Sequence, residues 1–299
     1  MKKVIICGLG AIGMTYAEKL VNSCFCDLRI LVDKERLEKL VKNPPLFNGK
    51  ALSLKYLLPE DDFKADIIII STKSQGLQSA LKNLKNHVKN KTYIISLING
   101  ISSEKIISEA FPEAIVLKSY FIGHSAVRIG NSVTQDGVGK IVIEENDYIT
   151  QFFKENNIDF LIPDDIDYSM WLKFLLNLFS NQVSAVLNMT FGEMKTNNHF
   201  LNFAEKIIEE VKSIAKKEGI KNTDNLKDDA IKALSLMCNE GKTSMLQDIL
   251  AKRKTEVDIF AGEVIRLGKF YNIPTPYNQV LYDLIKIAEE KNEHSIHSC

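Results

Sequence analysis

The chain has 299 residues, and its 38 Lys and Arg balance 38 Asp and Glu, so the formal net charge is zero. This balance argues against a nucleic-acid binder, which usually carries a basic excess, and no apolar run reaches the length of about 18 residues that spans a bilayer. The five cysteines follow neither a regular disulfide nor a zinc spacing. We therefore expect free thiols, no metal site and a cytoplasmic location.

The first part of the chain alternates short β-branched runs with helical patterns. The runs predict strands at residues 3–7, 28–32, 66–71, 93–96 and 114–117, and the patterns predict helices that include residues 11–21 and 75–88. Strands that alternate with helices predict a parallel sheet, and nearly uniform apolar runs predict that both of its faces are buried. A glycine-punctuated segment at residues 123–139 predicts a small antiparallel extension.

The second part, beyond residue 165, changes to helical periodicity throughout. The expected helices include residues 171–187, 201–215, 231–238, 257–270 and 280–288. We place the domain boundary near residue 165, and we expect the polar tail at residues 291–299 to fray.

A Gly-x-Gly-x-x-Gly motif stands between the first expected strand and the first expected helix. Such glycines permit a tight turn, close approach of a pyrophosphate and close packing of the helix, whose N-terminus attracts the anion. Asp33 follows the second strand about 20 residues later, where a carboxylate accepts hydrogen bonds from a ribose 2′-hydroxyl. This context favours a dinucleotide site over a purely structural turn. Its expected cofactor contacts in the loop are Gly8, Leu9, Gly10, Ala11, Ile12 and Gly13.

Two further loops follow expected strands, at residues 71–74 and at Asn99-Gly100. Ligands of doubly wound sheets bind beyond the carboxyl ends of the strands, so both loops are candidates for the nicotinamide end of the site. Each is equally well explained as a solvated turn. His124 has no acidic or metal-ligating partner nearby in the sequence, and we expect it to be structural or to lie on the surface.

Three polar residues, Lys173, Asn177 and Asn181, interrupt a strongly apolar helical segment at intervals of four. This spacing places them on one helix face. Asparagine is a mediocre helix former, and a solvent-facing stripe usually carries Glu, Lys or Gln, so we favour a lined cleft. A lysine there suits carbonyl reduction, because an ammonium group stabilises charge on oxygen and can donate a proton.

A second polar cluster spans residues 244–258. Ser244 is explained as a helix N-cap with Gln247 completing a capping box. Glu256 is explained as an ion-pair partner of Lys252 at i,i+4. Taken alone, both residues are therefore structural.

Together these motifs resemble those of the ketopantoate reductases (2-dehydropantoate 2-reductases) along the whole chain. The matching features are the glycine loop, Asn99-Gly100, the Lys-x3-Asn-x3-Asn helix, Ser244-Met245-Leu246-Gln247-Asp248 and Thr255-Glu256-Val257-Asp258. The resemblance implies reduction of 2-dehydropantoate to (R)-pantoate, on the route to pantothenate and coenzyme A. It also implies a fold: an α/β Rossmann-type domain with a doubly wound parallel sheet at residues 1–165, and an all-α substrate and catalytic domain at residues 166–299.

The resemblance also implies roles for individual residues. Lys173 would be the general acid, and Asn99 would help to hold it and the nicotinamide end of the cofactor. Asn177, Asn181 and Ser244 would contact the substrate, and Glu256 would bind its terminal hydroxyl. Lys73 lies where the family has a cofactor-side lysine.

This chain departs from the family pattern after the second strand. Relatives commonly have an arginine there that meets the 2′-phosphate of NADPH, whereas this chain has Asp33, followed by Lys34 and Arg36. The resemblance implies NADPH, but Asp33 predicts that NADH is used at least comparably.

Two alternatives to this function remain open: a reductase of another 2-oxo acid, and a non-catalytic dinucleotide-sensing module. The expected partner is a small-molecule 2-oxo acid, with no nucleic acid and no membrane. A homodimer is left open.

Overall fold

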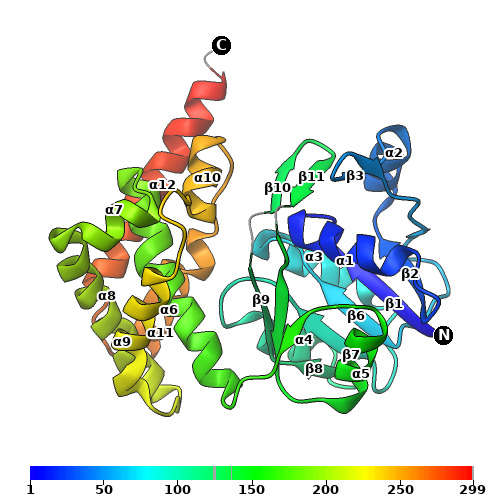
Figure 1. Cartoon of the computed structure of the whole chain (residues 1–299), viewed down its shortest axis with the longest axis horizontal. Helices are drawn as coiled ribbons and strands as arrows, with labels where there is room; N and C mark the ends of the chain where they lie inside the picture. Colours follow the sequence, from blue (N-terminus) through cyan, green and yellow to red (C-terminus); the bar gives the residue numbers. More distant parts are fainter. Residues whose placement is uncertain (124–125, 136, 298–299) are drawn as a thin grey trace. The chain divides into compact units, whose positions relative to one another are not determined.

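A computed structural model describes residues 1–123, 126–135 and 137–297 of the chain (Figure 1). The chain divides into two compact units, Met1–Ile166 and Asp167–Cys299. The functional roles expected for the two parts remain predictions. His124 lies outside the described residues, so its expected role is not addressed by the structure.

The first unit is built on a six-stranded sheet in the order β5-β2-β1-β6-β7-β8, with parallel pairing throughout its described strands. Numbered along the chain, this is the order 3-2-1-4-5-6 of doubly wound dinucleotide-binding sheets. The predicted fold class is therefore confirmed. The strands are β1 (Lys2–Cys7), β2 (Cys26–Leu31), β5 (Tyr56–Leu57), β6 (Ile67–Ile70), β7 (Tyr93–Ser96) and β8 (Ile115–Leu117).

Both faces of the sheet are buried, as the apolar runs predicted. Val4 and Ile69 belong to a core cluster that includes Phe152 of α5, while Ile5 and Ile68, which point to the other face, are also fully buried. Successive strand residues alternate between faces, so a strand covered on both sides must be apolar at every position. The helical elements are α1 (Ala11–Val21), α2 (Lys34–Lys42), η1 (Ser74–Gly76), α3 (Leu77–Leu84), α4 (Ser103–Ala110) and α5 (Asp147–Glu155).

The predicted antiparallel extension is present. Strand β10 (Ala126–Ile129) pairs antiparallel with β11 (Ser132–Gln135), which also pairs with β3 (Leu46–Phe47). Strand β3 pairs in turn with β4 (Lys50–Ala51). A further small sheet joins β13 (Phe160–Leu161), β12 (Lys140–Ile143) and β9 (Ser119–Ile122). Two-residue strands such as β3 and β4 are too short to show a hydrophobic period, so the sequence did not reveal them.

The second unit is helical, as predicted. Its last helix continues to His297, and residues 298–299, the end of the tail that was expected to fray, lie outside the described residues. One contact near that end is the Asn292 side chain, which donates to the Ile249 carbonyl at 3.3 Å. Among the helices that the structure describes, none has an apolar stretch long enough to cross a bilayer. The elements are α6 (Ile166–Leu187), α7 (Phe191–Thr196), α8 (Asn198–Lys217), η2 (Thr223–Asn225), α9 (Leu226–Ser235), α10 (Ser244–Leu250), η3 (Val257–Ile259), α11 (Ala261–Tyr271) and α12 (Pro276–His297).

A buried polar network joins four helices of this unit. Glu210 of α8 accepts hydrogen bonds from the backbone and side-chain nitrogens of Asn278 at the start of α12. Gln182 of α6 donates to Asn278 Oδ1 at 3.4 Å and accepts from the Ala261 N–H of α11 at 3.1 Å. Because buried polar groups need specific partners, this network fixes the rotation of α6 about its axis. It thereby sets the direction in which the polar face of α6 points within this unit.

Candidate functional site

The glycine loop joins β1 to α1 at the point where the strand order reverses. Gly8 has a φ of +100°, and a Cβ there would lie 2.7 Å from the Thr72 nitrogen. A Cβ on Gly13 would lie 1.9 Å from the Gly8 oxygen, so both positions require glycine for the fold itself. A Cβ on Gly10 would meet only the Ser71 oxygen, at an ordinary 3.7 Å. The protein therefore leaves space above Gly10, as close approach of a ligand requires.

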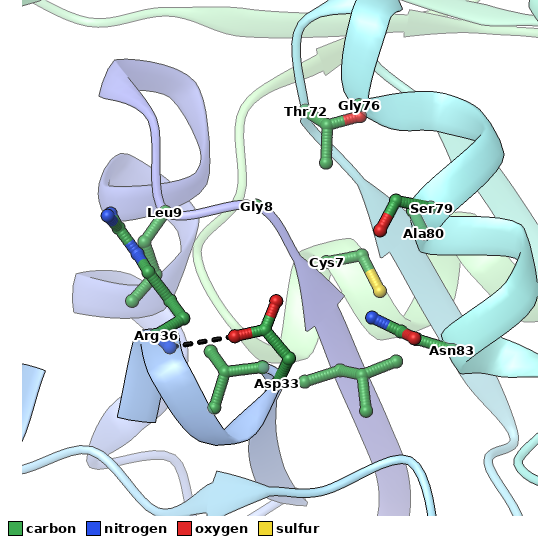
Figure 2. Close-up of a pocket in the computed structure, with 12 residues that line it drawn as sticks. Cys7, Gly8, Leu9, Asp33, Arg36, Thr72, Gly76, Ser79, Ala80 and Asn83 are labelled. Carbon is green, nitrogen blue, oxygen red and sulfur yellow. Dashed lines mark hydrogen bonds between the residues drawn. The ribbon is translucent and has the colours of Figure 1, made fainter. Parts of the chain in front are cut away.

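A cavity of about 220 Å³ opens beside this loop (Figure 2). Asp33 enters it from the start of α2, where its Oδ1 accepts the Arg36 N–H at 2.7 Å and caps the helix. Ser79 and Asn83 of α3 line the opposite side in Figure 2. The lining residues are Cys7, Gly8, Leu9, Leu31, Val32, Asp33, Arg36, Thr72, Gly76, Ser79, Ala80 and Asn83.

Unsatisfied polar groups in and beside this cavity fit a dinucleotide. The buried Thr72 Oγ1 has no hydrogen-bond partner among the residues that the structure describes. Gly10 is the N-cap of α1 and supplies no side-chain cap, so the first N–H groups of the helix and its dipole favour an anion. Burial raises the pKa of the Cys7 thiol, which therefore presents a neutral group to the cavity. The helix N–H groups suit the pyrophosphate of a dinucleotide, and the hydroxyl and carboxylate groups suit its ribose hydroxyls.

Three residues at or near the cavity were not predicted from the sequence: Ser79, Asn83 and Arg128. The first two follow Gly76 at helical spacing, a signal that was readable once α3 was placed after β6. Arg128 of β10 donates to the Leu9 carbonyl at 2.8 Å, a contact across the fold with no local signal. Burial lowers the pKa of Arg128, and so does the nearby Arg36 guanidinium. The Arg36 side chain lines the cavity, and the Arg128 guanidinium, held at the Leu9 carbonyl, lies outside that lining.

The two candidate loops follow strands β6 and β7 of the parallel sheet, as expected. Lys73 is exposed at the start of η1, outside the lining of the cavity. Asn99 is half-buried in the bend that follows β7. Below it, the buried Ser96 hydroxyl contacts the Ser103 hydroxyl at 2.8 Å, and Ser119 donates to the Ser96 carbonyl at 2.9 Å. These hydroxyl contacts hold the end of the strand that leads to Asn99.

In the second unit, the polar stripe lies along α6 as predicted. Lys173 and Asn177 are half-buried, and Asn181 is buried. The Asn181 side-chain nitrogen lies 3.5 Å from Ser244 Oγ at the start of α10. The structure therefore brings together two motifs that are 63 residues apart in the sequence.

The predicted N-cap at Ser244 was wrong by one residue. Thr243 caps α10, since its Oγ1 accepts the Leu246 N–H at 3.2 Å. Gln247 donates to the Lys242 carbonyl at 3.1 Å and completes no capping box at Ser244. Ser and Thr are both good caps, so local preference did not decide between them. The Ser244 side chain is exposed, and its hydroxyl is not used as the cap.

The pairing of Glu256 with Lys252 assumed one continuous helix, whereas residues 251–256 form a turn and a loop. Asp248 Oδ1 accepts the Arg253 Nε–H at 2.8 Å, and the Asp248 carbonyl accepts the Arg253 N–H at 2.8 Å. These bonds close the turn after α10 and lead the chain to Glu256, which is 9% exposed.

Comparison with known proteins matches both units to one family. Residues 4–148 match the family model described as "Ketopantoate reductase PanE/ApbA", and residues 165–289 match its C-terminal model. The chain belongs to the ketopantoate reductase family. The predicted resemblance is therefore confirmed, and membership makes the chain an oxidoreductase.

Individual relatives extend over nearly the whole chain. It is 28% identical over 302 residues to the 2-dehydropantoate 2-reductase of Pyrococcus horikoshii, covering 96% of this chain and 97% of that protein. Its fold matches a ternary D-mandelate dehydrogenase structure with NADH and anilino(oxo)acetate, with a TM-score of 0.84, 24% identity and coverage of 97% and 99%. It also matches a dimeric ketopantoate reductase from Staphylococcus aureus, with a TM-score of 0.79, 23% identity and the same coverage.

Proposed function

We propose that this chain reduces 2-dehydropantoate to (R)-pantoate with NAD(P)H, a step toward pantothenate and coenzyme A. The observation that carries the proposal is the approach of Asn181 to Ser244 on the face that also holds Lys173. Two polar motifs meet there, and neither Ser244 nor Asn181 is needed to cap α10. This arrangement supports a substrate site in a chain whose family reduces a 2-oxo acid.

The cofactor would be held by the first unit. The N–H groups at the start of α1 would bind the pyrophosphate, with Gly10 giving it room, and the Thr72 hydroxyl and Asp33 would bind polar groups of the nucleotide. Lys73 and Asn99 are assigned to the nicotinamide side by family likeness. When bound, the cofactor supplies a hydride to the substrate's ketone carbon.

Lys173 supplies the proton in this proposal. As the ketone carbon is reduced, negative charge develops on its oxygen, and the Lys173 ammonium stabilises that charge and transfers a proton from Nζ. The ketone oxygen becomes the product's hydroxyl. Asn177, Asn181 and Ser244 orient the substrate, and Glu256 accepts a hydrogen bond from its terminal hydroxyl.

For the cofactor, we propose that NADH is used at least comparably with NADPH. Asp33 lies in the cavity with its carboxylate fixed by the Arg36 N–H, a position suited to a ribose 2′-hydroxyl and unfavourable for a 2′-phosphate. The neighbouring Arg36 and Arg128 guanidinium groups act in the opposite direction, since they attract a phosphate. The balance between one carboxylate and two guanidinium groups therefore sets the preference.

A panel of 2-oxo acids with both cofactors tests the function. We expect the highest kcat/KM for 2-dehydropantoate, a lower value for 2-oxoisovalerate, which lacks the terminal hydroxymethyl group, and a lower value for an aromatic 2-oxo acid. A higher value for either of the other acids would favour the alternative reductase. Cofactor binding without turnover of any acid would favour the sensing module.

Two further parts of the proposal concern location and assembly. The four described cysteines, Cys7, Cys24, Cys26 and Cys238, are free thiols, which supports the cytoplasm as the site of the reaction. A homodimer is proposed by analogy with the dimeric relative. Light scattering coupled to size-exclusion chromatography would give a mass near 33.8 kDa for a monomer instead.

A further inference from the structure

A buried carboxylate of α12 holds the segment that carries Glu256. Glu289 Oε1 accepts hydrogen bonds from both the backbone N–H and the side-chain hydroxyl of Thr255, each at 2.6 Å. Thr255 is fully buried, and Glu289 is 7% exposed. Thr255 Oγ1 in turn accepts the Val257 N–H at 3.3 Å. The residues directly before and after Glu256 are thus both tied, through one hydroxyl, to one carboxylate.

The same helix holds this segment at a second point. Asp258 Oδ1 accepts the Tyr282 hydroxyl at 2.9 Å, and Asp258 Oδ2 accepts the Lys286 ammonium at 3.0 Å. Lys286 Nζ also lies 3.4 Å from Glu289 Oε2 and partly neutralises the buried carboxylate. Tyr282, Lys286 and Glu289 are spaced at i, i+4 and i+7, which places them on one face of α12. We call these three residues the α12 contact face.

We propose that Glu289 is a positioning residue for substrate specificity, which acts through Thr255 to hold the Glu256 carboxylate toward the substrate's terminal hydroxyl. This inference rests on the function proposed above. A carboxylate distinguishes a substrate that carries a terminal hydroxymethyl group from one that lacks it only if the carboxylate geometry is fixed, because hydrogen bonds weaken steeply with distance and angle. Residues 251–256 have no helix to fix them, so the α12 contact face supplies that rigidity.

The experiment compares three variants of the full-length chain. Glu289→Ala should lower the ratio of kcat/KM for 2-dehydropantoate over 2-oxoisovalerate by about tenfold, mainly through KM for 2-dehydropantoate. Glu289→Gln keeps an oxygen acceptor for Thr255 and should recover most of the ratio. Asp283→Ala removes an exposed residue of the same helix and should leave the ratio unchanged.

A double-mutant cycle separates positioning from general destabilisation. In a Glu256→Ala background, Glu289→Ala should no longer change the ratio, because the group that it positions is absent. A ratio unaffected by Glu289→Ala, or an equal loss in both backgrounds, would overturn the inference. Where Glu289→Ala does not fold, Thr255→Val keeps the side-chain shape, removes the hydroxyl and should lower the ratio in the same way.

The failure of the proposed function would look different. A parent enzyme that does not reduce 2-dehydropantoate, or a Glu256→Ala variant with an unchanged ratio, would overturn both the proposed function of Glu256 and this inference. The inference alone would be overturned if the parent were active and Glu256→Ala lowered the substrate ratio of kcat/KM, but Glu289→Ala left that ratio unchanged.

Discussion

Replacing Asp33 by asparagine should raise the preference for NADPH over NADH. The Asp33 carboxylate caps α2 by accepting the Arg36 N–H at 2.7 Å. Asparagine offers the same oxygen acceptor and is an equally good N-cap, so the helix should stay capped while the negative charge is lost. The variant therefore separates the effect of charge from that of structure.

The expected size follows from the exposure of the carboxylate. Two unit charges about 4 Å apart interact by about 1 kcal/mol in water and by about 4 kcal/mol at the effective dielectric of a protein surface. Because the Asp33 side chain is exposed, solvent screening favours the lower part of this range, about 1–2 kcal/mol. That corresponds to a change of about 5-fold to 30-fold in the cofactor ratio. Added salt should reduce it.

The assay measures kcat/KM and the dissociation constant for both cofactors at two salt concentrations. Arg36→Ala is the matched variant: it keeps the N–H that Asp33 accepts, removes the guanidinium group and should shift the ratio toward NADH. An Asp33→Asn ratio within about twofold of the parent would refute the reasoning, since that is below the smallest expected charge effect. A parent that prefers NADPH by more than about a hundredfold would mean that the guanidinium pair outweighs Asp33.

Three other predictions concern the second unit. Lys173→Ala should lower kcat by about 10²-fold to 10⁴-fold with unchanged cofactor affinity. A kcat within about threefold of the parent would show that Lys173 is not the general acid. Glu256→Ala should lower the ratio of kcat/KM for 2-dehydropantoate over 2-oxoisovalerate, because the acceptor for the terminal hydroxyl is removed. An unchanged ratio would mean that Glu256 has only a structural role. Thr243→Ala should lower the free energy of unfolding by about 1 kcal/mol with little change in KM, whereas Ser244→Ala should raise KM and leave stability nearly unchanged. If instead Ser244→Ala lowered the free energy of unfolding and Thr243→Ala raised KM, Ser244 would be the N-cap of α10.

The sequence by itself determined five of the six strands of the parallel sheet and the position of the glycine loop, whereas the two-residue strand β5 was not predicted. Strand β7 and helix α1 have the predicted bounds, because uniform apolar runs and helical periodicity are local properties of the chain. The glycine motif was equally readable, since Gly8 and Gly13 are required by backbone geometry next to one strand and one helix. A short helix, α7, was missed although Thr190 and Glu193 form a capping box that the sequence displays.

Only the tertiary structure decided what several polar residues do. Thr243 and Ser244 have nearly equal capping preferences, and the choice between them depends on the path of the chain into α10. Arg128 reaches the Leu9 carbonyl across 119 residues, and Glu289 reaches Thr255 across 34. Contacts of this kind leave no periodic trace in the sequence, because hydrophobic patterns record which face of an element is buried and not which polar partner meets it. The partner is fixed by packing, since a polar group taken out of water must find its hydrogen bond wherever the fold brings one.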